Sequence, residues 1–326
     1  MIVPTYWAEA RAEAVTPQGR RVRLLRFGWS DTDEADARRL AEVRVREAAE
    51  ALARGRRTAP REPKVPYNGA EGVPIREEVV RRVGETVLTR NSYGAICLNT
   101  PDVLFADVDF DASGPLLVSC LVSLAGGVAL AIEGGRRFGV RGVLFGLALG
   151  ALFALIASRA LSRAWTAARG GPERIAQRRV ARLASAQPRG RFEVYRTPAG
   201  LRVLAMHDVF DPAGEAARAL LAALGTDKQY VAMCRRQRCF RARLTAKPWR
   251  IGIQGRLRPR PGVWPVSPER RAERAAWLAA YDAAAAGHAA CRHERTLGLG
   301  PEHPRAAAVR KLHDELCRSH SDLPLA

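Results

Sequence analysis

The chain has 326 residues, enough for more than one folded domain, and a formal net charge of +20 from 53 Lys plus Arg against 33 Asp plus Glu. Its six cysteines are spread over this length, which excludes a small disulfide-stabilised secreted domain and is typical of a reducing compartment. The basic excess favours partners that carry phosphate, whether nucleic acid, nucleotide or anionic lipid.

The N-terminal segment, residues 1–56, predicts a strand followed by a helix. Residues 20–28 alternate between arginine and apolar side chains, as a half-buried strand does. Cap-forming and acidic residues at 30–34 favour a helix over 35–54, which Gly55 ends.

Residues 57–114 are expected to be the first half of a cytosolic α+β domain. After a linker rich in Pro and Arg, alternating and apolar stretches are separated by turn-forming residues. They predict a short helix over 75–83, strands over 86–89 and 95–98 joined by a turn at 91–94, and a strand over 103–111.

Residues 115–161 predict a hairpin of two transmembrane helices. Charge is absent from 115–132 and from 142–158, and at ~1.5 Å per residue each stretch approaches the ~30 Å hydrocarbon layer. A polar turn at 133–137 makes the two helices antiparallel. The alternative, a buried hairpin in a soluble protein, is disfavoured because apolar residues surround both helices.

Small residues recur at every fourth position in both helices. The two series are Ser119, Ser123, Gly127 and Ala131, and Gly142, Gly146, Gly150, Ala154 and Ser158. Such stripes let helix backbones approach closely in lipid, either within one hairpin or between the two chains of a homodimer.

Arginine placement predicts the orientation of the hairpin. Six arginines lie in residues 159–179, whereas three lie in or beside the turn, at Arg136, Arg137 and Arg141. Because cytoplasmic flanks carry the excess of positive charge, both termini are expected in the cytoplasm. The chain is then a multi-pass protein of the bacterial inner (cell) membrane.

Residues 162–326 are expected to be the second half of the cytosolic domain, with helices at its C-terminal end. The predicted elements are a helix over 162–185, strands over 191–195 and 201–207, helices over 215–224 and 227–236, an extended segment over 239–244, and helices over 268–286 and 304–318. The fold class is therefore an α+β cytosolic domain interrupted by a two-helix transmembrane hairpin.

Three carboxylates alternate along the strand expected over 103–111. Single residues separate Asp107, Asp109 and Asp111, so all three project from one face of a strand. Carboxylates this close repel one another unless a cation neutralises them, and oxygen-rich clusters suit Mg²⁺ or Mn²⁺. The alternative is an exposed acidic strand end that pairs with arginines.

A glycine-containing turn in the second half indicates a phosphate site. Arg196, Thr197 and Arg202 surround the turn that ends at Gly200, where guanidinium and backbone N–H groups could hold phosphate. The alternative is an ordinary β-turn with solvated arginines.

The strand with Asp107-x-Asp109, followed by a strand entered through this glycine turn, resembles the core of archaeo-eukaryotic-type primases. The resemblance implies that the acids bind a catalytic metal and that a histidine follows the turn. Here Arg202 stands where that histidine is expected, and His207 lies further along. The blocks 66–111 and 195–249 are more closely similar to a group of bacterial two-span membrane proteins to which no activity is assigned.

Two further sets of residues are candidates for binding. Arg241 and Arg243 share one face of the segment 239–244 and could contact phosphate or nucleic acid, or they could form the solvated face of an amphipathic strand. Candidate zinc ligands are Cys234, Cys239, Cys291 and His293, for which isolated buried thiols and a surface histidine are the alternative.

These residues are consistent with two functions. The first is a non-enzymatic, membrane-anchored protein whose basic domain binds a partner, anionic lipid, nucleotide or nucleic acid. The second is a membrane-tethered enzyme that uses Mg²⁺ or Mn²⁺ on a nucleotide or phosphate ester, with the metal at Asp107 and Asp109 and the phosphate at Arg196 and Arg202. The first is preferred, because the motifs of the second are short.

Overall fold

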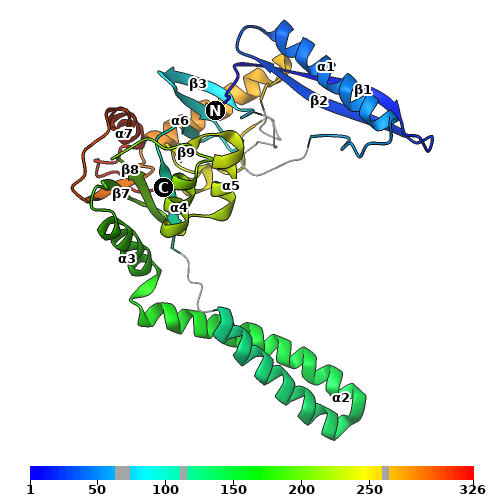
Figure 1. The fold of residues 1–326 in the computed structure, drawn as a ribbon, viewed down its shortest axis with the longest axis vertical. Coiled ribbons are helices and arrows are strands. Elements are labelled where there is room, and N and C mark those ends of the chain that lie inside the picture. Colours follow the sequence, from blue (N-terminus) through cyan, green and yellow to red (C-terminus); the bar gives the residue numbers. More distant parts are fainter. Residues whose placement is uncertain (63–73, 111–115, 259–263) are drawn as a thin grey trace. The chain divides into compact units, whose positions relative to one another are not determined.

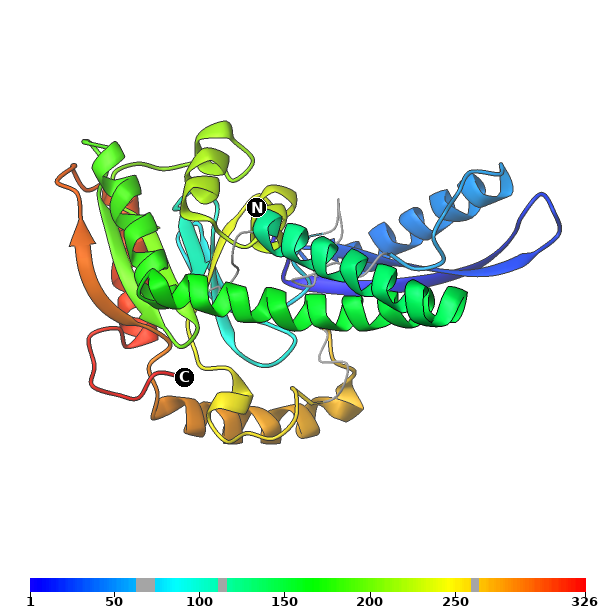
Figure 2. The same cartoon turned by 90° about the horizontal axis from the view of Figure 1, so that it is seen from below.

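The computed structural model describes residues 1–62, 74–110, 116–258 and 264–326, and of residues 116–124 and 153–155 it describes the backbone. The described chain is a mixed α+β protein with three antiparallel or mixed sheets and several helices (Figures 1 and 2). It divides into two compact units. The first comprises residues 1–107, 184–198 and 202–326, and the second comprises 108–183 and 199–201.

The N-terminal part of the first unit is a strand hairpin covered by one helix. Strands β1 (Tyr6–Val15) and β2 (Arg21–Ser30) pair antiparallel, and α1 (Glu34–Ala53) lies along them (Figure 1). The Asp33 side chain caps α1 by accepting a hydrogen bond from the Asp36 N–H at 2.7 Å. The strand and the helix expected here are confirmed, whereas β1 was not predicted.

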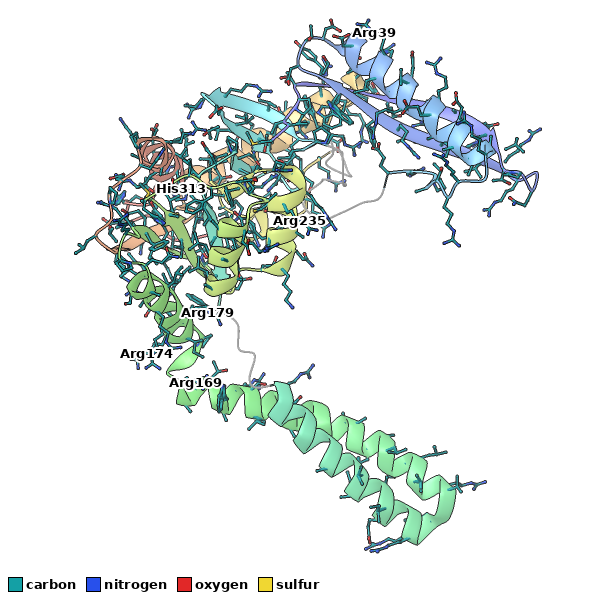
Figure 3. All side chains as sticks on the ribbon, in the orientation of Figure 1. Arg39, Arg169, Arg174, Arg179, Arg235 and His313 are labelled. Carbon is teal, nitrogen blue, oxygen red and sulfur yellow. The ribbon has the colours of Figure 1, made fainter. Side chains whose placement is uncertain are left out.

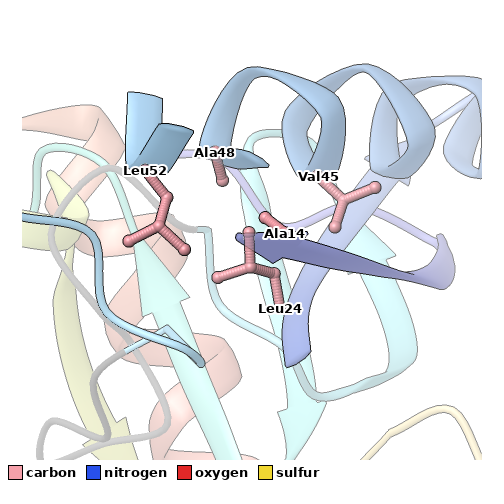
Figure 4. Close-up of a cluster of buried hydrophobic side chains, with 5 residues drawn as sticks. All are labelled: Ala14, Leu24, Val45, Ala48 and Leu52. Atoms are coloured by element: carbon pink, nitrogen blue, oxygen red, sulfur yellow. The ribbon is translucent and has the colours of Figure 1, made fainter. Parts of the chain in front are cut away.

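A small hydrophobic core joins α1 to the strand hairpin. Its buried side chains are Ala14, Leu24, Val45, Ala48 and Leu52 (Figure 4). The approach of the helix is close at Gly28, where a Cβ atom would overlap the backbone of α1 and lie 2.9 Å from the Ala41 Cα. Glycine at this position therefore sets the distance between the strand and the helix.

The four-stranded sheet of β3, β4, β5 and β9 combines strands from both sides of the apolar segment. In order across the sheet these strands are β3 (Glu78–Val83), β4 (Thr86–Arg90), β5 (Ile96–Thr100) and β9 (Phe240–Arg243). Each pairs antiparallel with its neighbour, and β9 joins the sheet through the pairing of Cys97 with Arg243.

A second four-stranded sheet also combines both halves of the sequence. Its strands, in order, are β10 (Arg292–Leu297), β7 (Phe192–Thr197), β8 (Gly200–Ala205) and β6 (Phe105–Asp109). In sequence, β6 precedes the apolar segment and the other three strands follow it. The apolar segment is therefore inserted between strands of the same sheet. Most of the chain before and after this segment thus folds together into the first unit.

Most of the predicted elements are found. The remaining helices are α3 (Gly171–Ala186), α4 (Glu215–Leu224), α5 (Lys228–Gln237), α6 (Arg271–Ala286) and α7 (Pro304–Cys317), with short 3-10 turns at Pro248–Arg250 and Pro268–Arg270. The strands expected over 86–89, 95–98, 191–195 and 201–207 and the extended segment 239–244 are confirmed as β4, β5, β7, β8 and β9.

Two expectations about secondary structure are wrong, and one further strand was not predicted. The helix over 75–83 is β3, where the β-branched valines of Glu78–Val83 pair with β4. The helix over 162–185 is divided at Gly170 and Gly171, whose φ angles of +87° and +91° favour glycine and end a helix. Strand β10 was missed because it alternates between charged and polar residues on an edge of its sheet.

The apolar segment forms α2 (Leu116–Ala168), a helix with two limbs. The backbone turns at Gly139, which has φ 64° and ψ −146°, and the limbs run antiparallel in both views (Figures 1 and 2). Gly142, Gly146 and Gly150 are buried, and a Cβ added at Gly150 would lie 2.6 Å from the Gly127 Cα of the other limb. The glycine stripe of the second limb is therefore packed within the chain.

Within the described residues, one helical segment is long and apolar enough to cross a membrane. This segment, Ala125–Ala168, has a mean hydropathy of 2.2 in its most apolar window, of which 20% is buried. A single candidate span is consistent with association with a membrane and does not support the multi-pass, two-span topology expected from the sequence.

We expect the substitution Gly28→Ala to destabilise the N-terminal strand hairpin and α1 by about 1–3 kcal/mol, because its methyl group overlaps the helix backbone. Hydrogen exchange of peptides from β1, β2 and α1 should accelerate by roughly tenfold for each 1.4 kcal/mol lost. The control is Gly287→Ala. Gly287 has φ −86°, and a Cβ atom added there would lie 3.8 Å from the Ala284 carbonyl oxygen, the nearest atom outside the adjacent residues, so this substitution should leave the exchange unchanged. Unchanged exchange in Gly28→Ala would contradict the close packing.

Candidate functional site

A group of buried polar side chains in the first unit is centred on Arg202 in β8. The Arg202 side chain is 2% exposed, and its Nε donates to the Asp107 Oδ1 at 3.1 Å. Its Nη1 donates to the Arg243 carbonyl at 2.8 Å and lies 3.3 Å from the His313 Nε2. One guanidinium thus connects β6, β8 and β9 with α7.

A second layer of this centre consists of two thiols and an imidazole. The Cys291 Sγ lies 3.8 Å from the His313 Nε2, and the Cys317 Sγ lies 3.7 Å from the Arg243 carbonyl oxygen. The ligand atoms of Cys291, His313 and Cys317 all lie within 4.8 Å of one another, and all three residues are fully buried. Figure 3 marks the position of His313. We call Cys291, His313 and Cys317 the C-terminal cluster.

The local structure explains how these side chains converge. His313 and Cys317 are four residues apart on α7, so they share one helix face. Cys291 immediately precedes β10, at the edge of the sheet that contains Arg202. The rings of Tyr195 and Phe105 pack against the imidazole, with centroid distances of 4.7 Å and 5.3 Å.

The environment shifts the pKa values of the cluster. A hydrogen bond from Cys317 and the nearby His313 hold the pKa of the Cys291 thiol well below its ordinary value, although burial opposes this. Burial raises the pKa of the Cys317 thiol, and its hydrogen bond to Cys291 adds to that effect. Burial works against a charged imidazole, yet the Cys291 thiolate and the bond to Asp314 raise the pKa of His313. Cys291 is therefore the thiol of the pair that ionises first.

Among the predicted metal ligands, Asp107 and Asp109 are described and Asp111 lies outside the described residues. The Asp107 carboxylate is 43% exposed and is paired with Arg202. Asp109 is exposed at the end of β6. The predicted metal ligand Asp107 and the predicted phosphate-binding residue Arg202 are therefore in contact with each other, as an ion pair within the fold.

The other predicted phosphate-binding residues lie in different surroundings. Arg196 and Thr197 are half-buried at the end of β7. Arg241 is 5% exposed, and its Nη2 lies 2.5 Å from an oxygen of Glu77, which is 2% exposed. The alternative of a solvated basic face is therefore wrong for Arg241, because Glu77 compensates its charge in the interior. Arg243 is half-buried and donates to the Thr245 carbonyl at 3.2 Å.

The predicted zinc ligands are divided between different environments. Within the part of the chain that the structure describes, Cys291 joins His313 and Cys317, and Cys234, Cys239 and His293 are not in that cluster. Burial raises the pKa of Cys239 to about 12 and raises that of Cys234 well above its ordinary value, so both are protonated thiols. The His293 Nε2 lies 2.7 Å from the buried carboxylate of Glu193.

Sequence reasoning missed His313 and Cys317. The signal was present as His-x-x-x-Cys on the helix predicted over 304–318, since residues four apart on a helix share a face. Cys291 and Arg202 lie close to that helix face only through tertiary packing, which no local sequence pattern predicts.

Comparison with models of known protein families, with curated proteins and with solved structures finds no match.

Proposed function

We propose that the protein is a non-enzymatic, membrane-anchored binding protein. In this proposal both limbs of α2 insert into the bilayer, and the arginines that follow them bind anionic headgroups. The observation that carries the proposal is the exposure of large apolar side chains along both limbs of α2.

That exposure is extensive. The exposed large apolar residues of α2 include Val128, Ile132, Phe138, Val140, Leu144, Phe145, Leu147, Leu149, Leu152 and Ile156, between 44% and 78% accessible. Exposure of so many apolar side chains to water is unfavourable, and an apolar surface of this size is typical of a site that contacts a membrane or a protein partner. Hydrocarbon covers all sides of a hairpin at once, whereas a protein partner covers one face.

Insertion of both limbs is supported by their lengths and their packing. Residues 116–138 and 140–158 would span roughly 34 Å and 28 Å as helices, close to the ~30 Å hydrocarbon layer. The limbs touch through glycines, which suits association in lipid. Near the turn, Glu133 pairs with Arg137 at 2.7 Å. This pair compensates the charge of one of the arginines that must cross the bilayer when the limbs insert.

A basic stretch follows the second limb directly. Its exposed arginines, on α2, on α3 and in the short turn between them, are Arg159, Arg163, Arg169, Arg174, Arg178, Arg179 and Arg182, three of which are labelled in Figure 3. The Arg169 guanidinium lies 3.9 Å from the centre of the Trp165 ring. Arginine and tryptophan together are typical of the interface between headgroups and water, and each cation near an anionic surface contributes about 1 kcal/mol.

The metal-dependent enzyme is less well supported. Its phosphate-binding Arg202 is buried and already bonded to Asp107, the residue that would hold the metal. To reach the Arg202 guanidinium, which is 2% exposed, a phosphate would have to break this ion pair, at a cost of several kcal/mol. A Mg²⁺ or Mn²⁺ site at Asp109 stays a prediction.

Insertion of both limbs predicts a specific labelling pattern. A membrane-impermeant maleimide added to intact spheroplasts should label Arg136→Cys, three residues before the turn at Gly139, because this end of the first limb is then outside the cell. It should label the control Arg174→Cys, on α3, only after the membrane is opened. Protection of Arg136→Cys until the cells are opened would contradict insertion of both limbs.

Binding of anionic headgroups predicts selective stabilisation by lipid. In neutral detergent, added phosphatidylglycerol should raise the Tm of the full chain more than phosphatidylcholine does, because a bound ligand stabilises the folded state. Replacing Arg174, Arg178 and Arg179 by Gln should reduce this difference, by about 1 kcal/mol of binding per arginine.

The matched control replaces Arg38, Arg39 and Arg46 by Gln. These three arginines are exposed on α1, so the control removes the same charge from a different surface. Control and wild type should respond equally to phosphatidylglycerol. Equal responses of wild type and the α3 variant would contradict a headgroup site on α3.

A further inference from the structure

We propose that the C-terminal cluster, Cys291, His313 and Cys317, is a binding site for a zinc ion, with two thiolates and one imidazole as protein ligands. This site is independent of the membrane anchor. It also differs from the ligand set that the sequence predicts, with which it shares Cys291.

The ligand types and their distances fit zinc. Thiolates and imidazoles are the ligands that hold Zn²⁺ in proteins, at about 2.3 Å and 2.0–2.1 Å. In a tetrahedral site these bond lengths place sulfur and nitrogen roughly 3.5 Å apart. The observed distance from the Cys291 Sγ to the His313 Nε2 is 3.8 Å, and no pair in the cluster exceeds 4.8 Å. Small side-chain movements would therefore complete the site.

The imidazole is already oriented as a metal ligand. The His313 Nδ1 lies 2.9 Å from an oxygen of Asp314, and a carboxylate accepts hydrogen bonds, so Nδ1 carries the proton. Nε2 then carries the lone pair, and the Cys291 Sγ lies 3.8 Å from it. A carboxylate that fixes the second nitrogen of a histidine in this way is a regular companion of zinc ligands.

The charges balance when a zinc ion is bound. Two thiolates and a neutral imidazole around Zn²⁺ have no net charge, which a fully buried position tolerates. The nearby Arg202 is matched by Asp107. Its Nη1 is 3.3 Å from the His313 Nε2 and 4.0 Å from the Cys317 Sγ, so on binding it exchanges the contact with nitrogen for one with the thiolate.

Zinc binds the thiolate form of cysteine, so both cluster thiols lose their protons to solvent on binding. Within the described residues the cluster supplies three ligands, which leaves the fourth position to water or another small ligand.

The test uses the full chain, purified under reducing conditions, stripped of metal and then incubated with Zn²⁺. Elemental analysis after removal of excess metal should find about one zinc per wild-type chain. Cys317→Ser and His313→Gln should lose it, because each removes one of three ligands. Cobalt in place of zinc should give thiolate-to-metal charge-transfer absorption that is weaker in Cys317→Ser.

The matched control is Cys239→Ser, a buried thiol outside the cluster, which should bind as much zinc as the wild type. Circular dichroism reports whether each variant is folded, and the result for the wild type does not depend on any variant. Wild-type chains that retain no zinc would overturn the proposal. So would a wild-type chain in which Cys291 and Cys317 resist alkylation after denaturation without reductant, because they then form a disulfide in place of a metal site.

Discussion

The ion pair and hydrogen bonds of the buried Arg202 guanidinium are the interactions on which the first unit depends. Transfer of a cation into the interior costs several kcal/mol unless an opposite charge and hydrogen bonds compensate it. Here Asp107 supplies the charge, and the Arg243 carbonyl and the His313 ring supply acceptors. These three groups come from β6, the end of β9 and α7, and Arg202 comes from β8, so the position of Arg202 fixes how these four elements meet.

This constraint also explains how the chain accommodates an apolar insertion. Asp107 precedes α2 and Arg202 follows it, and the two are 95 residues apart in sequence. A second buried pair, Glu77 with Arg241, joins the same two parts of the sequence in the other sheet. An arginine in each of the two four-stranded sheets thus forms an ion pair that spans the insertion. These pairs connect the segment before α2 to the segment after it.

Local patterns predicted most of the elements, because capping and periodicity are local. Asp33 caps the start of α1, as its residue type predicts. Gly170 and Gly171 interrupt the helix that was predicted to be continuous over 162–185. The edge strand β10 was missed since its polar residues carry no periodic signal of burial. Asp107 and Arg202 were each selected as functional residues, but their mutual contact depends on tertiary packing that no local pattern contains. The same reason hid the approach of Cys291 to His313.

A double-mutant cycle measures whether Arg202 and Asp107 stabilise the fold as a pair. Asp107→Asn should cost more free energy of unfolding than Arg202→Met, because it leaves a cation that is 2% exposed, whereas the carboxylate left by Arg202→Met is 43% exposed to water. The double variant should lose about 1–3 kcal/mol less than the sum of the two single losses. Additive losses would show that the two side chains act independently and would contradict the account.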